Sequence, residues 1–591
     1  MTRLPLRVAA VASATSLVLA ACGGSGTSGS SGSSGGTGLV TLAGVVATGD
    51  ALGNAAVSVA CVTGSGSATA DATSGHYSAT LSSGAVLPCV LTATSSDGAT
   101  TLHSVVTTGT VANITPLTEL LVAQVAGAAP SSLTAASVSA QFTTANVAAG
   151  QTAVLTLLKD AGIDTTNITD LLTGSLTIGS GGSSYDGVLD ALYTALAGAG
   201  STLASLTSTV VAQVTDSGST SASTDSAGSM LAPELLLKAR SSTCDALRSG
   251  DYWMAFSATS NGAYSALSVD AVAGTILVDG STTVTLTANG TCRYTVSGGG
   301  DLVVAPSGVL VGRFSDGSGN LTLGVGVPKQ THTLADAAGA WDEISSDTDY
   351  DGNNAFLGWQ FDYAQATISG TSSQITAGCV YPVGAQTPQC IPTGIAQPAA
   401  TTLAIADNGY SIVSHGSTWT DKIFAYRAGN GEWLEISANI SSSPTATAQD
   451  GTADGSIGFG THARTLGLPT VGTTSANWDV YMDTATELST LATDTTAITI
   501  TAIDSTAGSF TRTAGQDSGP THSETLFINN PYDGFDFRDL ATGVAASDGS
   551  TVTVRKTIYL KTGVGVSVNL QPVTSASATS RLNIAVTMPA Q

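Results

Sequence analysis

Apolar and polar residues alternate from residue 39 to about residue 110, with turn residues between the runs. Alternation with a period of two is typical of strands that bury one face. Val57, Val59 and Cys61, for example, share one face of a strand. The pattern predicts a β-sandwich over residues 39–112.

The spacing of apolar residues changes near residue 114. Thr115 and Pro116 are typical of a helix start, with Thr as the N-cap and Pro as the first helical residue. An apolar stripe at helical spacing follows, which we interpret as a core face. The spacing predicts a helical domain over residues 113–215, with helices at 116–125, 132–142 and 152–161 and one running from Tyr185 through Leu196 to Val214.

Residues 216–240 begin with a Ser, Thr and Gly-rich stretch and are predicted to be a linker. Residues 241–591 are rich in short strand patterns, for example at 282–288, 302–311, 321–327, 497–503 and 561–570. The predicted fold is therefore multidomain and mainly β. It has an N-terminal sandwich, a central helical segment and a large antiparallel C-terminal region of one or two barrels or sandwiches.

The N-terminus has the features of an export signal. Arg3 and Arg7 precede a mostly apolar stretch of small residues that ends in Leu19-Ala20-Ala21-Cys22. This ending resembles the lipobox of bacterial lipoproteins, which implies removal of residues 1–21 and lipidation of Cys22. Residues 22–38 form a Gly and Ser-rich tether. Gly23 in place of Asp after the Cys implies sorting to the outer membrane, where the lipid holds the body at the bilayer.

Residues 39–112 resemble the carboxypeptidase-regulatory-like, transthyretin-like modules of exported bacterial proteins. The likeness rests on Gly44-Val45-Val46, on residues 52–59 and on a pattern formed by Thr69, Asp71, Gly75, Tyr77 and Leu81. Residues 113–118, directly after this segment, resemble the same region of lipoproteins of β-proteobacteria. The resemblance implies a spacer or binding module without catalysis.

Composition narrows the function classes. Only 10% of the residues are charged, and 18 Lys and Arg face 42 Asp and Glu, for a net charge of −24. A general nucleic-acid-binding surface is excluded, because such surfaces are built from Lys and Arg.

The cysteines indicate an exported protein. With Cys22 assigned to lipid, six of the seven remain, and an even number in an exported chain predicts disulfides. Six cysteines allow 15 pairings. Grouping by domain favours Cys61–Cys89, Cys244–Cys292 and Cys379–Cys390, and the absence of CxxC spacing argues against zinc.

One segment has metal-ligand spacing. Asp347, Asp349, Asp351 and Asn353 follow the D-x-D-x-D-G pattern, which resembles the first half of an EF-hand calcium loop. The twelfth position is Gly358 rather than the bidentate Glu, and Asp342 or Glu343 could supply that carboxylate. A solvated acidic turn between two strands is the alternative. Calcium is the one cofactor that the sequence suggests.

No catalytic residue is assigned. The single G-x-S-x-G pattern lies in the tether, away from any strand or helix. His522, near Glu524 and Asp517, forms the best acid–base cluster, but its spacing fits no catalytic motif. Tyr532–Phe537 alternates aromatic and acidic residues. It could stack on sugars or anchor a partner, and we interpret Phe535 and Phe537 as core residues.

Three functions remain open. The first is a lipid-anchored cell-envelope protein with a non-catalytic binding, adhesion or structural role, whose extracellular ligand is a carbohydrate or a protein. The second is a secreted-type hydrolase acting on polysaccharide or peptide, which would need paired carboxylates in a cleft. The third is a lipocalin-like carrier of apolar ligands. It is suggested by the G-x-W patterns at Trp341 and Trp433, which resemble the start of calycin barrels.

Overall fold

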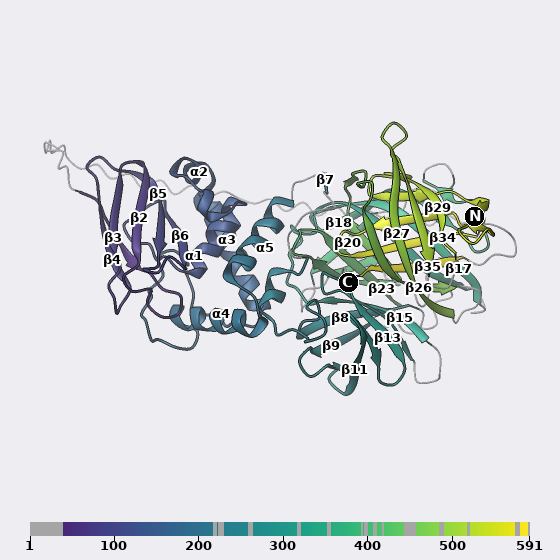
Figure 1. Ribbon diagram of the computed structural model, residues 1–591, viewed down its shortest axis with the longest axis horizontal. Coiled ribbons are helices and arrows are strands. Elements are labelled where there is room, and N and C mark those ends of the chain that lie inside the picture. Colours follow the sequence, from purple (N-terminus) through teal and green to yellow (C-terminus); the bar gives the residue numbers. More distant parts are fainter. Residues whose placement is uncertain are drawn as a thin grey trace, which may run out of the picture. The chain divides into compact units, whose positions relative to one another are not determined.

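The computed structural model describes residues 39–216, 221–222, 230–257, 264–315, 321–350, 356–391, 394, 400–405, 411–415, 419–441, 457–483, 490–516, 520–573 and 580–588. The predicted signal peptide, Cys22 and the first tether lie outside these residues. The described chain is mainly β, as predicted, and in chain order a helical segment follows an N-terminal sheet and precedes larger strand assemblies (Figure 1).

The N-terminal strands form one antiparallel sheet in the order β1-β4-β3-β2-β5-β6. Alternate residues of β2 and β4 are buried, and Val57, Val59 and Tyr77 contribute to the core of this sheet. The assignment to the carboxypeptidase-regulatory-like modules stays a prediction. The strands are β1 (Thr41–Val45), β2 (Ala56–Thr63), β3 (Ser65–Thr69), β4 (His76–Leu81), β5 (Val86–Thr94) and β6 (Thr101–Val106).

The first helix begins where the sequence predicts. Thr115 is its N-cap and accepts a hydrogen bond from the Thr118 N–H at 3.3 Å, and Pro116 is the first helical residue. Leu117 and Leu120 are fully buried, so the predicted stripe is a core face. The helices are α1 (Pro116–Ala126), α2 (Ala135–Gln141), α3 (Thr144–Asp160), α4 (Tyr185–Ala199) and α5 (Leu203–Asp216), with 3₁₀ turns η1 (Pro130–Ser132) and η2 (Pro233–Leu237).

The prediction of one continuous helix from Tyr185 to Val214 is wrong. Gly200 ends α4 in the left-handed region, with φ of 64°, which residues other than Gly rarely adopt. The helices α4 and α5 therefore meet at an angle of 95°. Among the described residues, no single helix is long and apolar enough to cross a membrane. The bent pair of α4 and α5 meets that criterion only when the two are taken together, by length and composition.

The first barrel is closed by eight strands in sequence order. Its inner face is apolar: Phe256 and Phe314 meet edge to face, with ring centroids 5.8 Å apart. Gly324 makes room for Phe314, because a Cβ there would lie 2.7 Å from the Phe314 ring. The strands are β8 (Gly250–Phe256), β9 (Tyr264–Asp270), β10 (Thr275–Val278), β11 (Thr282–Gly290), β12 (Arg293–Val296), β13 (Gly300–Val304), β14 (Leu310–Ser315) and β15 (Leu321–Pro328).

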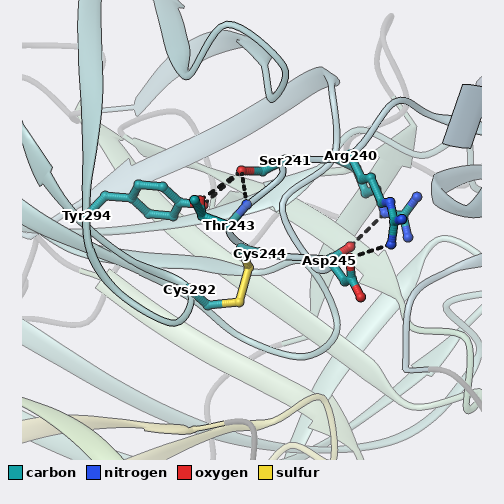
Figure 2. Close-up of a disulfide and its surroundings, with 8 residues drawn as sticks. Arg240, Ser241, Thr243, Cys244, Asp245, Cys292 and Tyr294 are labelled. Carbon is teal, nitrogen blue, oxygen red and sulfur yellow. Dashed lines mark hydrogen bonds and ion pairs between the residues drawn. A yellow bond between two sulfur atoms is a disulfide. The ribbon is translucent and has the colours of Figure 1, made fainter. Parts of the chain in front are cut away.

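The segment before β8 packs against the turns of this barrel. Cys244 forms a disulfide with Cys292 in the β11–β12 turn, and the Tyr294 hydroxyl lies 2.9 Å from the Thr243 hydroxyl (Figure 2). Residues 235–237 are buried Leu residues. The part of the predicted linker from residue 230 to residue 240 is therefore folded, because its apolar side chains join the core.

The second assembly is a nine-stranded sheet that curls on itself, because β18 pairs with both β20 and β17. Ile344, Phe361 and Phe459 lie on the face that joins the main apolar cluster. The strands are β16 (Gly339–Tyr350), β17 (Phe356–Ser369), β18 (Ser372–Tyr381), β19 (Gln389–Cys390), β20 (Thr401–Ile405), β21 (Ser411–His415), β22 (Trp419–Arg427), β23 (Trp433–Ser441) and β24 (Ile457–His462).

The C-terminal barrel closes in the order β26-β27-β28-β29-β30-β33-β34-β35. The hairpin of β31 and β32 lies between β30 and β33 in the chain, and β7 (Ser221–Ala222) pairs in parallel with β25 (Thr465–Leu466). The remaining strands are β26 (Thr474–Asp483), β27 (Thr490–Asp504), β28 (Ser509–Gln516), β29 (His522–Ile528), β30 (Phe535–Arg538), β31 (Ala541–Ala545), β32 (Thr551–Val554), β33 (Thr557–Lys561), β34 (Val566–Gln571) and β35 (Arg581–Thr587).

Two predicted strands are hairpins. The segments 302–311 and 561–570 each contain the end of one strand, a turn and the start of the next. In the first case Gly308, with φ of 90°, allows the turn, and in the second case Gly563 and Gly565 do so, with φ of 76° and 79°. An apolar run interrupted by Gly therefore marks two antiparallel strands here rather than one.

Candidate functional site: a polar cavity in the C-terminal barrel

The C-terminal barrel has a polar inner face. Asp479 and Tyr481 of β26 line a cavity inside the barrel, whereas Trp478, Val480 and Met482 point the other way and are buried in the main apolar cluster. Successive side chains of a strand face opposite sides, so each strand supplies one polar and one apolar face. The apolar side chains point outward and pack against the rest of the protein, and the polar side chains point into the barrel.

The cavity has a volume of about 250 Å³ and is rich in cations. Asp479 and Glu524 are the carboxylates that line it, and His522 lies beside them. This lining contrasts with the whole chain, which has 18 Lys and Arg and a net charge of −24. The lining cations are Arg512, Arg538, Arg555, Lys561 and Arg581.

Glu524 lies between two guanidinium groups. Arg512 faces it across β28 and β29 and donates to its Oε1, while Arg538 donates to its Oε2. Burial alone would raise the pKa of Glu524, but Arg512 and Arg538 outweigh burial and hold this pKa well below its usual range. The carboxylate is therefore ionised and fixed, and the three groups together carry a net positive charge.

The other ends of the two arginines are fixed as well. Arg512 donates to the Tyr559 hydroxyl at 3.1 Å, and Arg538 donates to Thr557 Oγ1 at 2.7 Å. His522 Nε2 lies 3.7 Å from Glu524 Oε2. The predicted cluster of His522 and Glu524 is thus brought together in the cavity, and Asp517 lies outside the described residues.

Asp479 is held by neutral donors. Thr496 Oγ1 donates to its Oδ2 at 2.6 Å and Asn583 Nδ2 donates to its Oδ1 at 3.1 Å. Burial raises the pKa of Asp479, although both hydrogen bonds oppose that shift.

Lys561 has a carboxylate neighbour on the same inner face. Its Nζ lies 3.6 Å from Asp536 Oδ2. Burial lowers the pKa of Lys561 and raises the pKa of Asp536, and their mutual attraction opposes both shifts.

Among the described residues, two buried amide oxygens at the cavity have no hydrogen-bond donor. They are Gln571 Oε1 and Asn583 Oδ1, and both residues line the cavity. An unsatisfied buried acceptor costs about 1–3 kcal/mol, so a bound molecule that donates to it is favoured.

The predicted calcium segment lies elsewhere, at the hairpin of β16 and β17. Asp347 and Asp349 belong to β16, and Asp347 pairs with Gln360 across the hairpin. Asp351 and Asn353 lie outside the described residues, so calcium binding stays a prediction. Among the described residues, no group of three or more His, Cys, Asp or Glu side chains is placed to hold a metal ion.

The six remaining cysteines form three disulfides, Cys61–Cys89, Cys244–Cys292 and Cys379–Cys390. These are the pairs that grouping by domain favours. Each joins neighbouring segments, for example the facing residues of β2 and β5.

The aromatic segment 532–537 contributes to the core, as we interpreted it. Phe535 is fully buried and its ring centroid lies 6.2 Å from that of Tyr363 in the nine-stranded sheet. Phe537 is partly buried against the same cluster.

The cations of the cavity were missed at the level of sequence. They lie on different strands, so no short motif contains them. One signal was available: Arg512, Arg538, Arg555, Lys556, Lys561 and Arg581, six of the 18 basic residues, fall within the last 80 residues. An enrichment of cations at strand positions that alternate with apolar residues indicates a charged barrel interior.

Comparison with known proteins assigns no family. No protein-family description and no curated protein sequence matches the chain. Solved structures of transferrin binding protein B are weakly similar. The protein from serogroup B Neisseria meningitidis shows 10% identity over 56% of this chain and 66% of that chain, with a TM-score of 0.17. Two mutants from Haemophilus parasuis Hp5 show 12% and 11% identity over 56% and 58% of this chain and 67% and 76% of those chains, with TM-scores of 0.18 and 0.17. TM-scores this low transfer neither a fold nor a function.

Proposed function

We propose that the chain is a lipid-anchored protein of the bacterial outer membrane with a non-catalytic binding role, and that the cavity of the C-terminal barrel holds its ligand. The lipobox at Cys22 supports the anchor and three disulfides support export. The observation that carries the binding role is the polar cavity of about 250 Å³ inside the barrel.

Binding is favoured over hydrolysis by the state of the carboxylates. A general acid needs a pKa near the working pH, but Glu524 is held far below that by Arg512 and Arg538. Burial raises the pKa of Asp479, but both of its carboxylate oxygens are occupied by hydrogen bonds from Thr496 and Asn583. Outside the cavity, Glu343 and Glu435 flank Gly460 on one face of the nine-stranded sheet. Glu435 is only 7% exposed, so a polymeric substrate would not reach it.

A polar ligand is favoured over an apolar one. The cavity is lined by charged and amide groups, whereas carriers of apolar ligands have apolar pockets. The space next to Trp341 is filled: its ring contacts Trp433 and His462, with centroids 6.1 and 4.2 Å away, and its indole N–H donates to the Ala337 carbonyl at 2.8 Å.

The anchor is tested by cell fractionation. Cys22→Ser removes the lipid acceptor and should release the protein from membranes into the soluble fraction. Cys61→Ser with Cys89→Ser is the matched control, because it removes sulfur atoms elsewhere and should leave the protein on the membrane. Membrane retention of the Cys22→Ser variant would contradict the anchor.

The binding role is tested by ligand-observed NMR with a panel of sugars, amino acids and organic acids. Ala585 lines the cavity and is 4% exposed, so Ala585→Leu reduces the cavity from within. The wild type should bind at least one member and the variant should bind it far less. Ala545→Leu, at an exposed position of β31, is the control. If the wild type binds no member, or if the variant binds equally well, the proposed role is wrong.

A further inference from the structure

The charge of the cavity indicates the charge of its ligand. Five cations and two carboxylates line it. Two more carboxylates, of Asp494 and Asp536, face the interior because they pair in register with the lining residues Asp479 and Tyr559. Among the residues whose side chains the structure describes, five cations then face four carboxylates. An acidic protein that gathers cations around one cavity favours an anionic ligand there.

The type of cation indicates which anionic group the ligand carries. Four of the five are arginines, whose planar guanidinium groups donate in pairs to carboxylate or phosphate oxygens. Arg512 and Arg538 are oriented by Glu524, by Tyr559 and by Thr557. A fixed orientation lowers the entropic cost of binding. These groups are therefore suited to bind one oxyanion in a defined position.

The unpartnered amide oxygens indicate a second property. Gln571 is 7% exposed and Asn583 is 5% exposed, and in the part of the chain that the structure describes neither side-chain oxygen has a donor. An oxyanion alone cannot satisfy an acceptor. The ligand must also carry donors such as hydroxyl groups, which would remove the cost of leaving these oxygens unpaired.

The volume limits the size. Pockets for drug-sized ligands measure about 300–1,000 Å³, and this cavity measures about 250 Å³. We propose that the cavity binds a small polyhydroxylated organic anion of the size of one sugar acid. This inference rests on the proposed binding function and adds the chemical class of the ligand.

The test is isothermal titration of the full-length protein in detergent with five probes. Gluconate and glucose 6-phosphate carry hydroxyl groups with a carboxylate or a phosphate. Glucose lacks the charge, glucosamine reverses it, and hexanoate lacks the hydroxyl groups. Gluconate or glucose 6-phosphate should bind at least about tenfold more tightly than each of the other three, and the tighter of the two identifies the oxyanion.

Paired variants connect the affinity to the cavity. Arg555 lines the cavity, whereas the next residue, Lys556, lies over the Phe537 ring at 5.5 Å and is not part of the lining. Arg555→Gln should raise the Kd of the preferred probe about tenfold, and Lys556→Gln, with the same charge change, should leave it unaltered.

Gln571→Leu removes an unpartnered oxygen at nearly constant volume and should reduce the preference for gluconate over hexanoate.

The outcomes separate the inference from the function on which it rests. If glucose or glucosamine binds as tightly as the anionic probes, the ligand need not be an anion, and that part of the inference is wrong. Equal effects of Arg555→Gln and Lys556→Gln lead to the same conclusion. In both cases the binding role stands. If hexanoate binds as tightly as gluconate, the inference that the ligand carries hydroxyl groups is wrong. If none of the five probes binds while another member of the NMR panel does, the ligand class is wrong and the function stands. If nothing binds in either experiment, both are wrong.

Discussion

Two buried glutamates show how the neighbours of a residue decide its charge. Glu524 lies between two arginines, which hold its pKa well below the usual range. Glu435 is buried in the nine-stranded sheet, and burial together with the nearby Glu343 raises its pKa to about 8. Gly460 pairs with Glu435 on one side and with Glu343 on the other, which places the two glutamates on the same face of the sheet.

The raised pKa of Glu435 predicts a loss of stability with rising pH. Between its ordinary pKa of 4.5 and about 8, the unfolded chain has released a proton that the folded chain retains. Stability therefore falls as pH rises through this window. From pH 5 to pH 8 this one group lowers the free energy of unfolding by about 3 kcal/mol. Glu435→Gln should remove that part of the decline, as measured by urea unfolding at both pH values.

Other buried carboxyl groups also contribute to the pH dependence of stability. Burial also raises the pKa values of Glu234 and Asp342 to about 7, so the variant should keep some pH dependence. Asp97→Asn is the control, since Asp97 is fully exposed and its pKa is lowered by hydrogen bonds from Ser95 and Ala99. An unchanged slope between pH 5 and pH 8 in Glu435→Gln would contradict the assignment.

At the scale of elements, the disulfides differ in the length of chain that they close. Cys244–Cys292 spans 48 residues and Cys379–Cys390 spans 11. Because a crosslink stabilises mainly by restricting the unfolded chain, the longer loop should contribute more, about 4 kcal/mol against about 3 kcal/mol. The double variants Cys244→Ala with Cys292→Ala and Cys379→Ala with Cys390→Ala allow the comparison by urea unfolding.

Hydrogen bonds near Cys244 add to the expected difference in stabilisation between the two disulfides. The Cys244 segment also contacts the first barrel through Tyr294, whose hydroxyl lies 3.2 Å from the Ser241 hydroxyl (Figure 2). Tyr294→Phe in the otherwise native chain measures that contact separately. A larger loss of stability from the Cys379 and Cys390 pair than from the Cys244 and Cys292 pair would show that loop length does not dominate.

The elements also show what the sequence could predict. Alternation and capping signals are local, so the N-terminal strands, the start of α1 at Pro116 and the strand-rich body follow from short windows. The break at Gly200 was missed because the apolar spacing continues past it. The cavity was missed because Arg512 and Glu524 face each other only after β28 and β29 pair, and Arg581 reaches the same interior from β35.

At the scale of the whole molecule, Tyr426 joins three assemblies. Its hydroxyl donates to the Ser307 carbonyl at 2.5 Å and accepts from the Ala232 N–H at 3.3 Å. The Ser307 hydroxyl in turn donates to the Val564 carbonyl at 2.6 Å. These hydrogen bonds connect the nine-stranded sheet, a turn of the first barrel and a turn of the C-terminal barrel.

Tyr426→Phe should therefore weaken more than one assembly. The substitution keeps the buried ring but leaves the Ser307 carbonyl and the Ala232 N–H unpaired, at a cost of about 1–3 kcal/mol in the free energy of unfolding. Hydrogen exchange should increase in the turns around Ser307 and Val564 together, because the Tyr426 hydroxyl holds Ser307 in place and the Ser307 hydroxyl in turn donates to the Val564 carbonyl. Tyr193→Phe removes a hydroxyl from a side chain that is 68% exposed and should change neither measurement. Faster exchange around Ser307 alone would mean that the two barrels are not coupled through this contact.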